Sequence, residues 1–192
     1  MYVIFSYLPH LIGLIYFFKR RKLGFITLCE SLLRAIGAYY TIIFVLQVVF
    51  SFFEMISATS ELIIGTIIEE MIKILFFTLF KKEHKKTDFV VSCLLFSIIE
   101  NNYISFETVR EAIFRAILFF THCAFSMNFL YQFYRYKKSL SGYVKGLFSA
   151  IASHLIYNLL TLSQIPFICF SAYVVALEKC MLSELENTPE CF

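Results

Sequence analysis

The chain has 192 residues, of which 59% are hydrophobic and only 16% are charged, and its mean hydropathy is +0.75. Soluble domains contain about 45–50% apolar residues, so this composition excludes an ordinary soluble domain and indicates a membrane protein. The formal net charge of +3 gives no reason to expect a nucleic-acid partner. With 6 Gly and 3 Pro, we expect one compact helical domain over residues 1–192.

Long apolar segments follow one another along the whole chain. A hydrocarbon core of about 30 Å needs about 20 helical residues to cross it. Six segments meet this requirement and predict an all-α, polytopic transmembrane bundle. They are residues 1–18, 35–53, 62–80, 89–106, 112–134 and 144–164. A seventh apolar stretch, residues 166–177, is too short to assign and stays open between a further span and a re-entrant or interfacial segment.

Basic residues orient the predicted bundle. Twelve of the 17 Lys and Arg residues lie in three short clusters, at 19–22, 81–86 and 135–145, and each cluster follows an odd-numbered span. Basic loops face the cytoplasm, so the pattern predicts a multi-pass protein of the cell membrane with its N-terminus outside. The first span has no basic residues before it and no small-residue cleavage site, which favours a retained anchor over a signal peptide.

Ionisable and amide side chains interrupt four consecutive predicted spans. An ionisable group near the bilayer centre costs about 2.5–3.5 kcal/mol, so each is expected to face the bundle interior. The groups are Glu69, Glu70 and Lys73 in the third span, Glu100 and Asn101 in the fourth, Arg115 and His122 in the fifth, and His154 and Asn158 in the sixth.

Spacing and depth predict that these groups meet. Side chains three, four or seven residues apart share a helix face, and each of the four spans has one such polar stripe. Counting about 1.5 Å per residue places both glutamates of the third span and both histidines near the middle of the membrane, with Glu100 nearer its outer face. The sequence therefore predicts one shared site of two to three carboxylates and two imidazoles.

Hydrolysis is the chemistry that this set serves best. A buried glutamate can act as general base towards water, while imidazoles position the water, donate to an oxyanion or bind Zn²⁺. Asn158 can orient His154 or donate to the oxyanion, and Lys73 offsets the charge of the glutamate pair. Each group also has a structural interpretation: Glu69 and Lys73 as an internal ion pair, Asn158 as a link between helices. Transport is disfavoured, because few Gly and Pro residues are present to break helices.

Four segments, in order and spacing, resemble the membrane motifs of the PrsW family of intramembrane proteases. They are "IIEEMIKILFF", "FSIIENNYISF", "RAILFFTHCAFS" and "GLFSAIASHLIYNLL". The PrsW family is grouped with the type II CAAX prenyl endopeptidases and the bacteriocin-immunity proteins. The resemblance covers residues 61–160 and implies a protease-like core there, with residues 1–60 as additional N-terminal helices.

The resemblance carries roles onto individual residues. It implies a bundle whose buried Glu and His residues activate water to cut a peptide bond of a membrane-anchored protein in or beside the bilayer. Glu69 is the first choice as base, with Glu70 as its rival, and a glutamate mechanism is favoured over zinc. The matching residues are Glu69, Glu70, Lys73, Glu100, Asn101, His122, His154 and Asn158; a zinc ion, if one is used, would have His122, His154 and Glu100 as ligands.

Two other functions stay open at this point. One is a prenyl-protein or peptide-processing endopeptidase, although those enzymes usually have an arginine one position later than Lys73, where this chain has Ile74. The other is a non-catalytic immunity or scaffold protein that keeps the motifs as polar contacts. The presence of both glutamates and both histidines favours an enzyme over such a protein.

Overall fold

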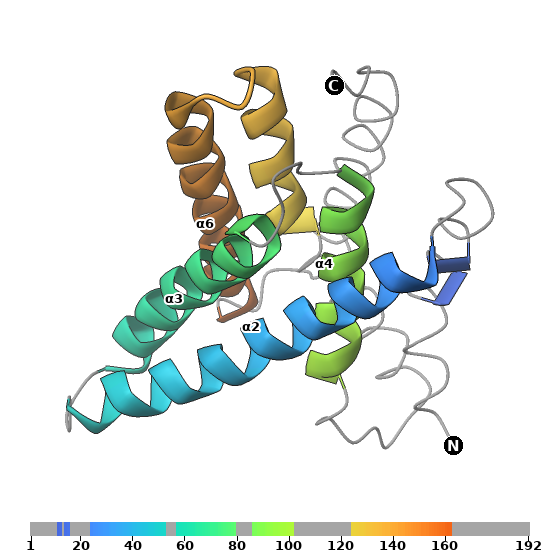
Figure 1. The fold of residues 1–192 in the computed structure, drawn as a ribbon. Coiled ribbons are helices and arrows are strands. Elements are labelled where there is room, and N and C mark those ends of the chain that lie inside the picture. Colours follow the sequence, from blue (N-terminus) through green and yellow to red (C-terminus); the bar gives the residue numbers. More distant parts are fainter. Residues whose placement is uncertain are drawn as a thin grey trace.

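The structure is a computed structural model, and it describes residues 11–12, 14–15, 24–52, 57–79, 86–101 and 124–162 (Figure 1). These residues are helical apart from short turns and helix ends, and no strand occurs among them, which confirms the all-α prediction for this part of the chain. The helices are α2 (Phe25–Ser51), α3 (Ala58–Leu79), α4 (Lys86–Asn101) and α6 (Leu140–Leu162), and residues 124–135 form a further helical stretch.

Helix α2 begins ten residues before its predicted start at residue 35. The residues between the two starts include the charged pair Glu30 and Arg34. The two side chains lie one helical turn apart, and Arg34 Nη2 is 3.3 Å from Glu30 Oε2. Because pairing across one turn satisfies both charges within the helix, Arg34 can be buried without ending it.

Helix α4 lies at the centre of the described bundle. Its side chains are buried without interruption from Phe89 to Ser97, and it contacts both α2 and α3. Aromatic rings connect it to its neighbours: Phe89 packs edge-on against Phe77 of α3, with ring centroids 5.6 Å apart, and stacks on Phe129 at 5.8 Å. A helix buried on all sides fixes the relative positions of the helices around it.

Helix α6 approaches the helical residues 124–135 closely, and Figure 1 shows the two side by side. Gly142, Gly146 and Ala150 are all buried and recur every fourth residue on one face of α6. A Cβ atom at Gly146 would lie 2.7 Å from the backbone oxygen of Phe129. Small residues at this spacing allow two backbones to approach, as they do in many membrane helix pairs.

Gly146→Ala is therefore expected to destabilise the fold by about 1–3 kcal/mol, because the added methyl group collides with backbone that cannot move aside. The midpoint of thermal unfolding in detergent measures the effect. Gly65→Ala in α3 is the matched control, since no described atom lies within 4 Å of its Cβ position. This control is expected to be neutral or stabilising, because alanine favours helix more than glycine does. Equal midpoints for the two variants would contradict the close approach.

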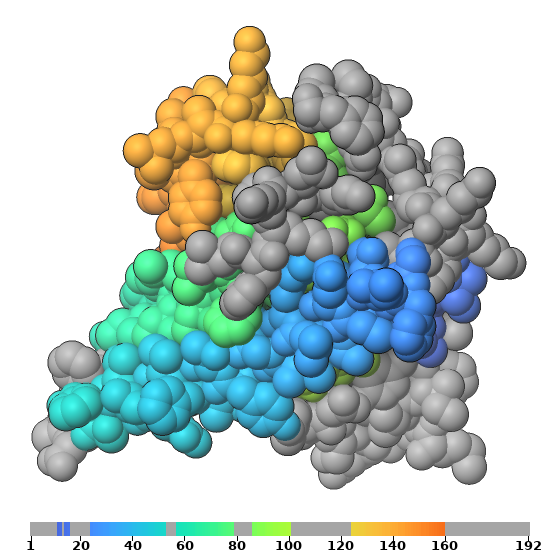
Figure 2. Space-filling view, viewed as in Figure 1, coloured from blue at the N-terminus to red at the C-terminus, as the bar shows by residue number. Residues whose placement is uncertain are grey.

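The distribution of polar and apolar side chains is inverted relative to a soluble protein. Lys73, Glu70 and His154 are among the largest fully buried side chains. Large apolar side chains such as Leu33 and Phe44 of α2 are exposed by 69% and 65%. Figure 2 shows α2 running along the front surface of the molecule. Charged groups of α3 thus lie inside the bundle while part of its apolar surface faces outwards.

Helix α2 is long and apolar enough to span a membrane, by its length of 27 residues and its composition, and only 22% of its most apolar window is buried. Among the described residues it is the one helix that meets both requirements. The described part of α4 has 16 residues. Helix α3 is long enough, but Glu69, Glu70 and Lys73 reduce its apolar character.

Candidate active site

Three charged side chains converge on one face of α3. Glu69 and Lys73 lie four residues apart and Glu70 and Lys73 lie three apart, so all three meet on one side of the helix. Lys73 Nζ is 2.9 Å from Glu69 Oε1 and also forms an ion pair with Glu70 Oε1. The ring of Phe96 from α4 lies 5.2 Å from the same ammonium group. One buried cation therefore bridges two carboxylates against an aromatic face.

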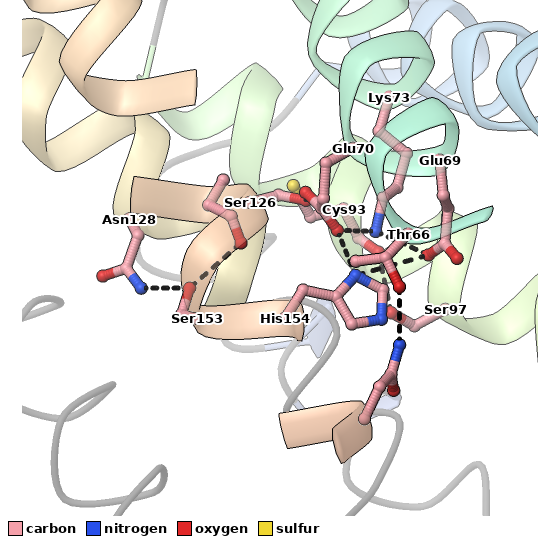
Figure 3. A network of polar contacts seen from close by, with 12 residues as sticks. Thr66, Glu69, Glu70, Lys73, Cys93, Ser97, Ser126, Asn128, Ser153 and His154 are labelled. Atoms are coloured by element: carbon pink, nitrogen blue, oxygen red, sulfur yellow. Dashed lines mark hydrogen bonds and ion pairs between the residues drawn. The ribbon is translucent and has the colours of Figure 1, made fainter. Parts of the chain in front are cut away.

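Helix α6 brings His154 to this group, 84 residues further along the chain (Figure 3). His154 Nδ1 lies 2.8 Å from Glu70 Oε1 and 4.0 Å from Glu69 Oε1. The imidazole stacks on the ring of Phe125, with centroids 4.9 Å apart and planes 17° apart. An ionised Glu70 can only accept, so beside it Nδ1 carries the proton, and Nε2 is the nitrogen that can exchange a proton with another group.

The two glutamates occupy different environments. Glu70 is completely buried, and its second oxygen, Oε2, accepts a hydrogen bond from Ser126 Oγ at 3.1 Å. Lys73, His154 and Ser126 thus all direct donors at Glu70. Glu69, in contrast, keeps 17% of its side chain accessible. The structure therefore distinguishes an enclosed carboxylate, Glu70, from an accessible one, Glu69.

Asn158 lies one turn after His154 on α6 and joins the site through a residue of α3. Its Nδ2 donates to Thr66 Oγ1 over 2.9 Å. Thr66 precedes Glu70 by one helical turn and is buried. In the structure, Asn158 thus donates to Thr66. The sequence indicated a different partner, His154 or an oxyanion.

The remaining predicted site residues are placed only in part. Glu100 of α4 is half-buried, and its charge acts on the Lys73 ammonium. Asn101 is the last residue of α4, and its side chain lies outside the described part. Arg115 and His122 also fall outside the described residues.

Thr66 and Ser126 belong to the site but were not singled out in the sequence. Hydroxyl side chains in apolar helices commonly bond to the carbonyl one turn earlier, as Ser97 does to Cys93 at 3.1 Å, so their presence alone carries no signal. Spacing is the signal that would have found them. Thr66 lies four residues before Glu70, and Ser126 lies four residues after His122.

Comparison of the chain with protein-family models, with curated proteins and with solved structures finds no match. The site geometry and the four motifs are therefore the basis for assigning a function. Two carboxylates, an ammonium group and an imidazole, drawn from two helices into the interior of an apolar bundle, are suited to acid–base chemistry on a bound water.

Proposed function

We propose that this protein is a multi-pass membrane protease that hydrolyses a peptide bond in or next to the membrane segment of a membrane-anchored protein. The observation that carries the proposal is the buried contact between the Glu69–Glu70–Lys73 group of α3 and His154 of α6. These are residues of the motifs that resemble the PrsW family, and they lie far apart in the sequence.

The inverted side-chain distribution supports the membrane part of the proposal. A soluble protein rarely buries a lysine, a glutamate and a histidine while exposing many Phe, Leu and Ile side chains. Lipid around the bundle would accept the exposed apolar faces of α2 and α6, and a polar interior is where ionisable groups of membrane helices are expected. The proposed location is the cell membrane, with the six predicted spans and an outside N-terminus.

In the proposed reaction Glu69 is the general base. Of the two glutamates it is the accessible one, and Lys73 holds its side chain in place. Glu69 takes a proton from a water molecule, whose oxygen attacks the scissile carbonyl carbon. The C–N bond then breaks, and the amine leaves with a proton from the site. Each step uses a group that the described bundle provides.

Glu70 and His154 act as a pair in this scheme. Glu70 holds His154 in the tautomer with a proton on Nδ1, so that the unprotonated Nε2 faces the reaction, where it accepts the proton that Glu69 has taken from the water and returns it to the leaving amine. Ser126 and Lys73 keep Glu70 in its orientation. His122, four residues before Ser126, would share its helix face in the predicted span and so complete the site beside Glu70.

Zinc is the alternative to a glutamate mechanism, and the described donor set fits it poorly. Glu69, Glu70 and His154 offer three ligand atoms within 4.8 Å of one another. The Lys73 ammonium, however, is in ion-pair contact with both carboxylates and occupies the place that a cation would take. A divalent ion would have to displace Lys73 against charge repulsion. The proposed reaction therefore includes no step at a metal.

A zinc chelator is accordingly expected to leave the cleavage rate unchanged. Purified protein would be incubated with 1,10-phenanthroline and assayed beside a sample incubated with a non-chelating phenanthroline isomer. Inhibition by the chelating isomer alone, reversed by added Zn²⁺, would contradict the glutamate mechanism.

Cleavage of a tagged library of single-span proteins tests the proposed function. Membranes containing the wild-type protein would be compared with membranes containing Glu69→Ala, His122→Ala or His154→Ala. A specific fragment that disappears in all three variants supports the protease. If the fragments require a prenylated cysteine, the processing endopeptidase is the better assignment. Fragments that persist in all variants, or no fragment with any substrate, would favour the non-catalytic alternative.

A further inference from the structure

Two hydrogen bonds join α3 to α6 one helical turn apart. Thr66 and Glu70 lie four residues apart on α3, and Asn158 and His154 lie four residues apart on α6. The Thr66–Asn158 bond measures 2.9 Å and the Glu70–His154 bond 2.8 Å. Because the numbering rises along one helix and falls along the other, the helices run antiparallel here and the bonds form successive rungs between them.

The Thr66–Asn158 rung has a defined direction. The single hydroxyl proton of Thr66 points to the backbone oxygen of Leu62, 2.7 Å away. Thr66 Oγ1 can therefore only accept from Asn158, which must present its NH2 group to α3. The Leu62 carbonyl thus fixes the orientation of the hydroxyl, and the hydroxyl fixes the orientation of the Asn158 amide.

We propose that Thr66 is a positioning residue for His154, acting through Asn158 to set the register of α6 against α3. This inference rests on the proposed function for its catalytic meaning. The stacked contact with Phe125 fixes the plane of the imidazole but lets the ring slide within that plane. Apolar packing between the helices is likewise non-directional. The Thr66 rung supplies a second directional constraint along the helix axis, one turn from the Glu70–His154 bond.

A second threonine of α3 provides a matched control. Thr78 is also buried and bonds to the carbonyl one turn earlier, Ile74 O, at 2.6 Å. Thr78 lies 12 residues from Thr66, or about 18 Å along the helix. A valine there removes a buried hydroxyl from the same helix without touching the His154 rung.

The test combines an NMR signal with kinetics on the full chain in detergent micelles. The chain contains only 4 His residues, so histidine labelled with ¹⁵N and ¹³C gives few signals, and His154→Gln assigns the one of interest. The readouts are the Nδ1–H signal of His154 and kcat and KM for a single-span substrate. The variants are Thr66→Val, Thr66→Ser, Thr78→Val and Asn158→Leu.

Thr66→Val is expected to lose the His154 Nδ1–H signal and to lower kcat by about 10–100-fold with KM unchanged, since a displacement of about 1 Å can cost 10²-fold. Thr66→Ser and Thr78→Val are expected to keep both the signal and kcat. Asn158→Leu removes the other partner of the Thr66–Asn158 hydrogen bond and is expected to lose the His154 signal as well. A Thr66→Val variant that keeps the signal and kcat, or a Thr78→Val variant that loses them equally, would overturn the inference.

The two proposals fail in different ways. If the wild-type chain shows the His154 Nδ1–H signal, Thr66→Val removes it and no substrate is cleaved, the positioning role of Thr66 stands and the protease function is wrong. If the wild-type chain cleaves substrate and Thr66→Val leaves the signal unchanged, the protease function stands and the positioning role is wrong.

Discussion

Glu69→Gln is expected to lower the cleavage rate by about 10²–10⁴-fold, the usual contribution of a general base. Glutamine keeps the size of the side chain and a polar contact with Lys73, but its amide cannot take a proton from water. The Glu70–His154 hydrogen bond does not depend on Glu69, so the helices should keep their arrangement. The measurement is the initial rate of fragment formation from a single-span substrate in proteoliposomes.

Glu61→Gln is the matched control for this variant, because Glu61 lies in the first turn of the same helix and is exposed to the surroundings. It is expected to cleave at the wild-type rate. Both variants should unfold at the wild-type temperature in detergent. Wild-type activity in Glu69→Gln, together with inactivity in Glu70→Gln, would reverse the roles assigned to the two glutamates.

Lys73→Met is expected to destabilise the folded state by about 3–5 kcal/mol, the usual consequence of removing one partner from a buried charge pair. Lys73 is in ion-pair contact with both glutamates, and 2% of its side chain is accessible. Methionine fills much of the same volume, so the loss of stability reflects the removed charge rather than a new cavity. Two neighbouring carboxylates would then repel each other in a site that excludes water. Titration with SDS in mixed micelles measures the change in the free energy of unfolding.

A second substitution should recover part of this loss. In the double variant Lys73→Met with Glu70→Gln, the enclosed carboxylate is neutral, and less uncompensated charge remains in the site. Lys145→Met on the exposed face of α6 is the control, where only a contact with the ring of Tyr136 is lost, worth less than about 1 kcal/mol. A Lys73→Met variant as stable as this control would show that the ion pairs do not hold the bundle together.

The long apolar segments of the sequence located the described helices but not all of their ends. The predicted span 62–80 corresponds to α3, and the span 144–164 corresponds to α6, which begins four residues earlier. Helix α2 begins ten residues before the predicted start, and the added residues include the Glu30–Arg34 ion pair. Apolar content alone treats a charged residue as the end of an apolar segment. Pairing with an opposite charge four residues away offsets the free-energy cost of keeping that residue in the helix.

The close approach of α6 to residues 124–135 was also not predicted. Its signal, Gly142 and Gly146 followed by Ala150, is present in the sequence, but which helix a small-residue face contacts depends on tertiary packing.

For the site, residue type and spacing were informative, while hydrogen-bond partners could not be predicted. Spacing placed Glu69, Glu70 and Lys73 on one face of a helix, and the structure brings His154 to the same place. The difference between the enclosed and the accessible glutamate could not be predicted, because it depends on where Ser126 lies in the fold. Glu69 and Glu70 are adjacent and identical in type, so only the direction in which each side chain points from the helix distinguishes them.

The most direct test of the central claim is hydrolysis by the purified chain in proteoliposomes, in water enriched in H₂¹⁸O, with a substrate identified from the single-span library. We predict that mass spectrometry finds ¹⁸O in the new carboxyl terminus of the fragment, that Glu69→Gln and His154→Gln form no fragment, and that Glu61→Gln matches the wild type. A fragment formed equally by wild type, Glu69→Gln and His154→Gln would contradict the claim that this buried network activates water to cut a peptide bond.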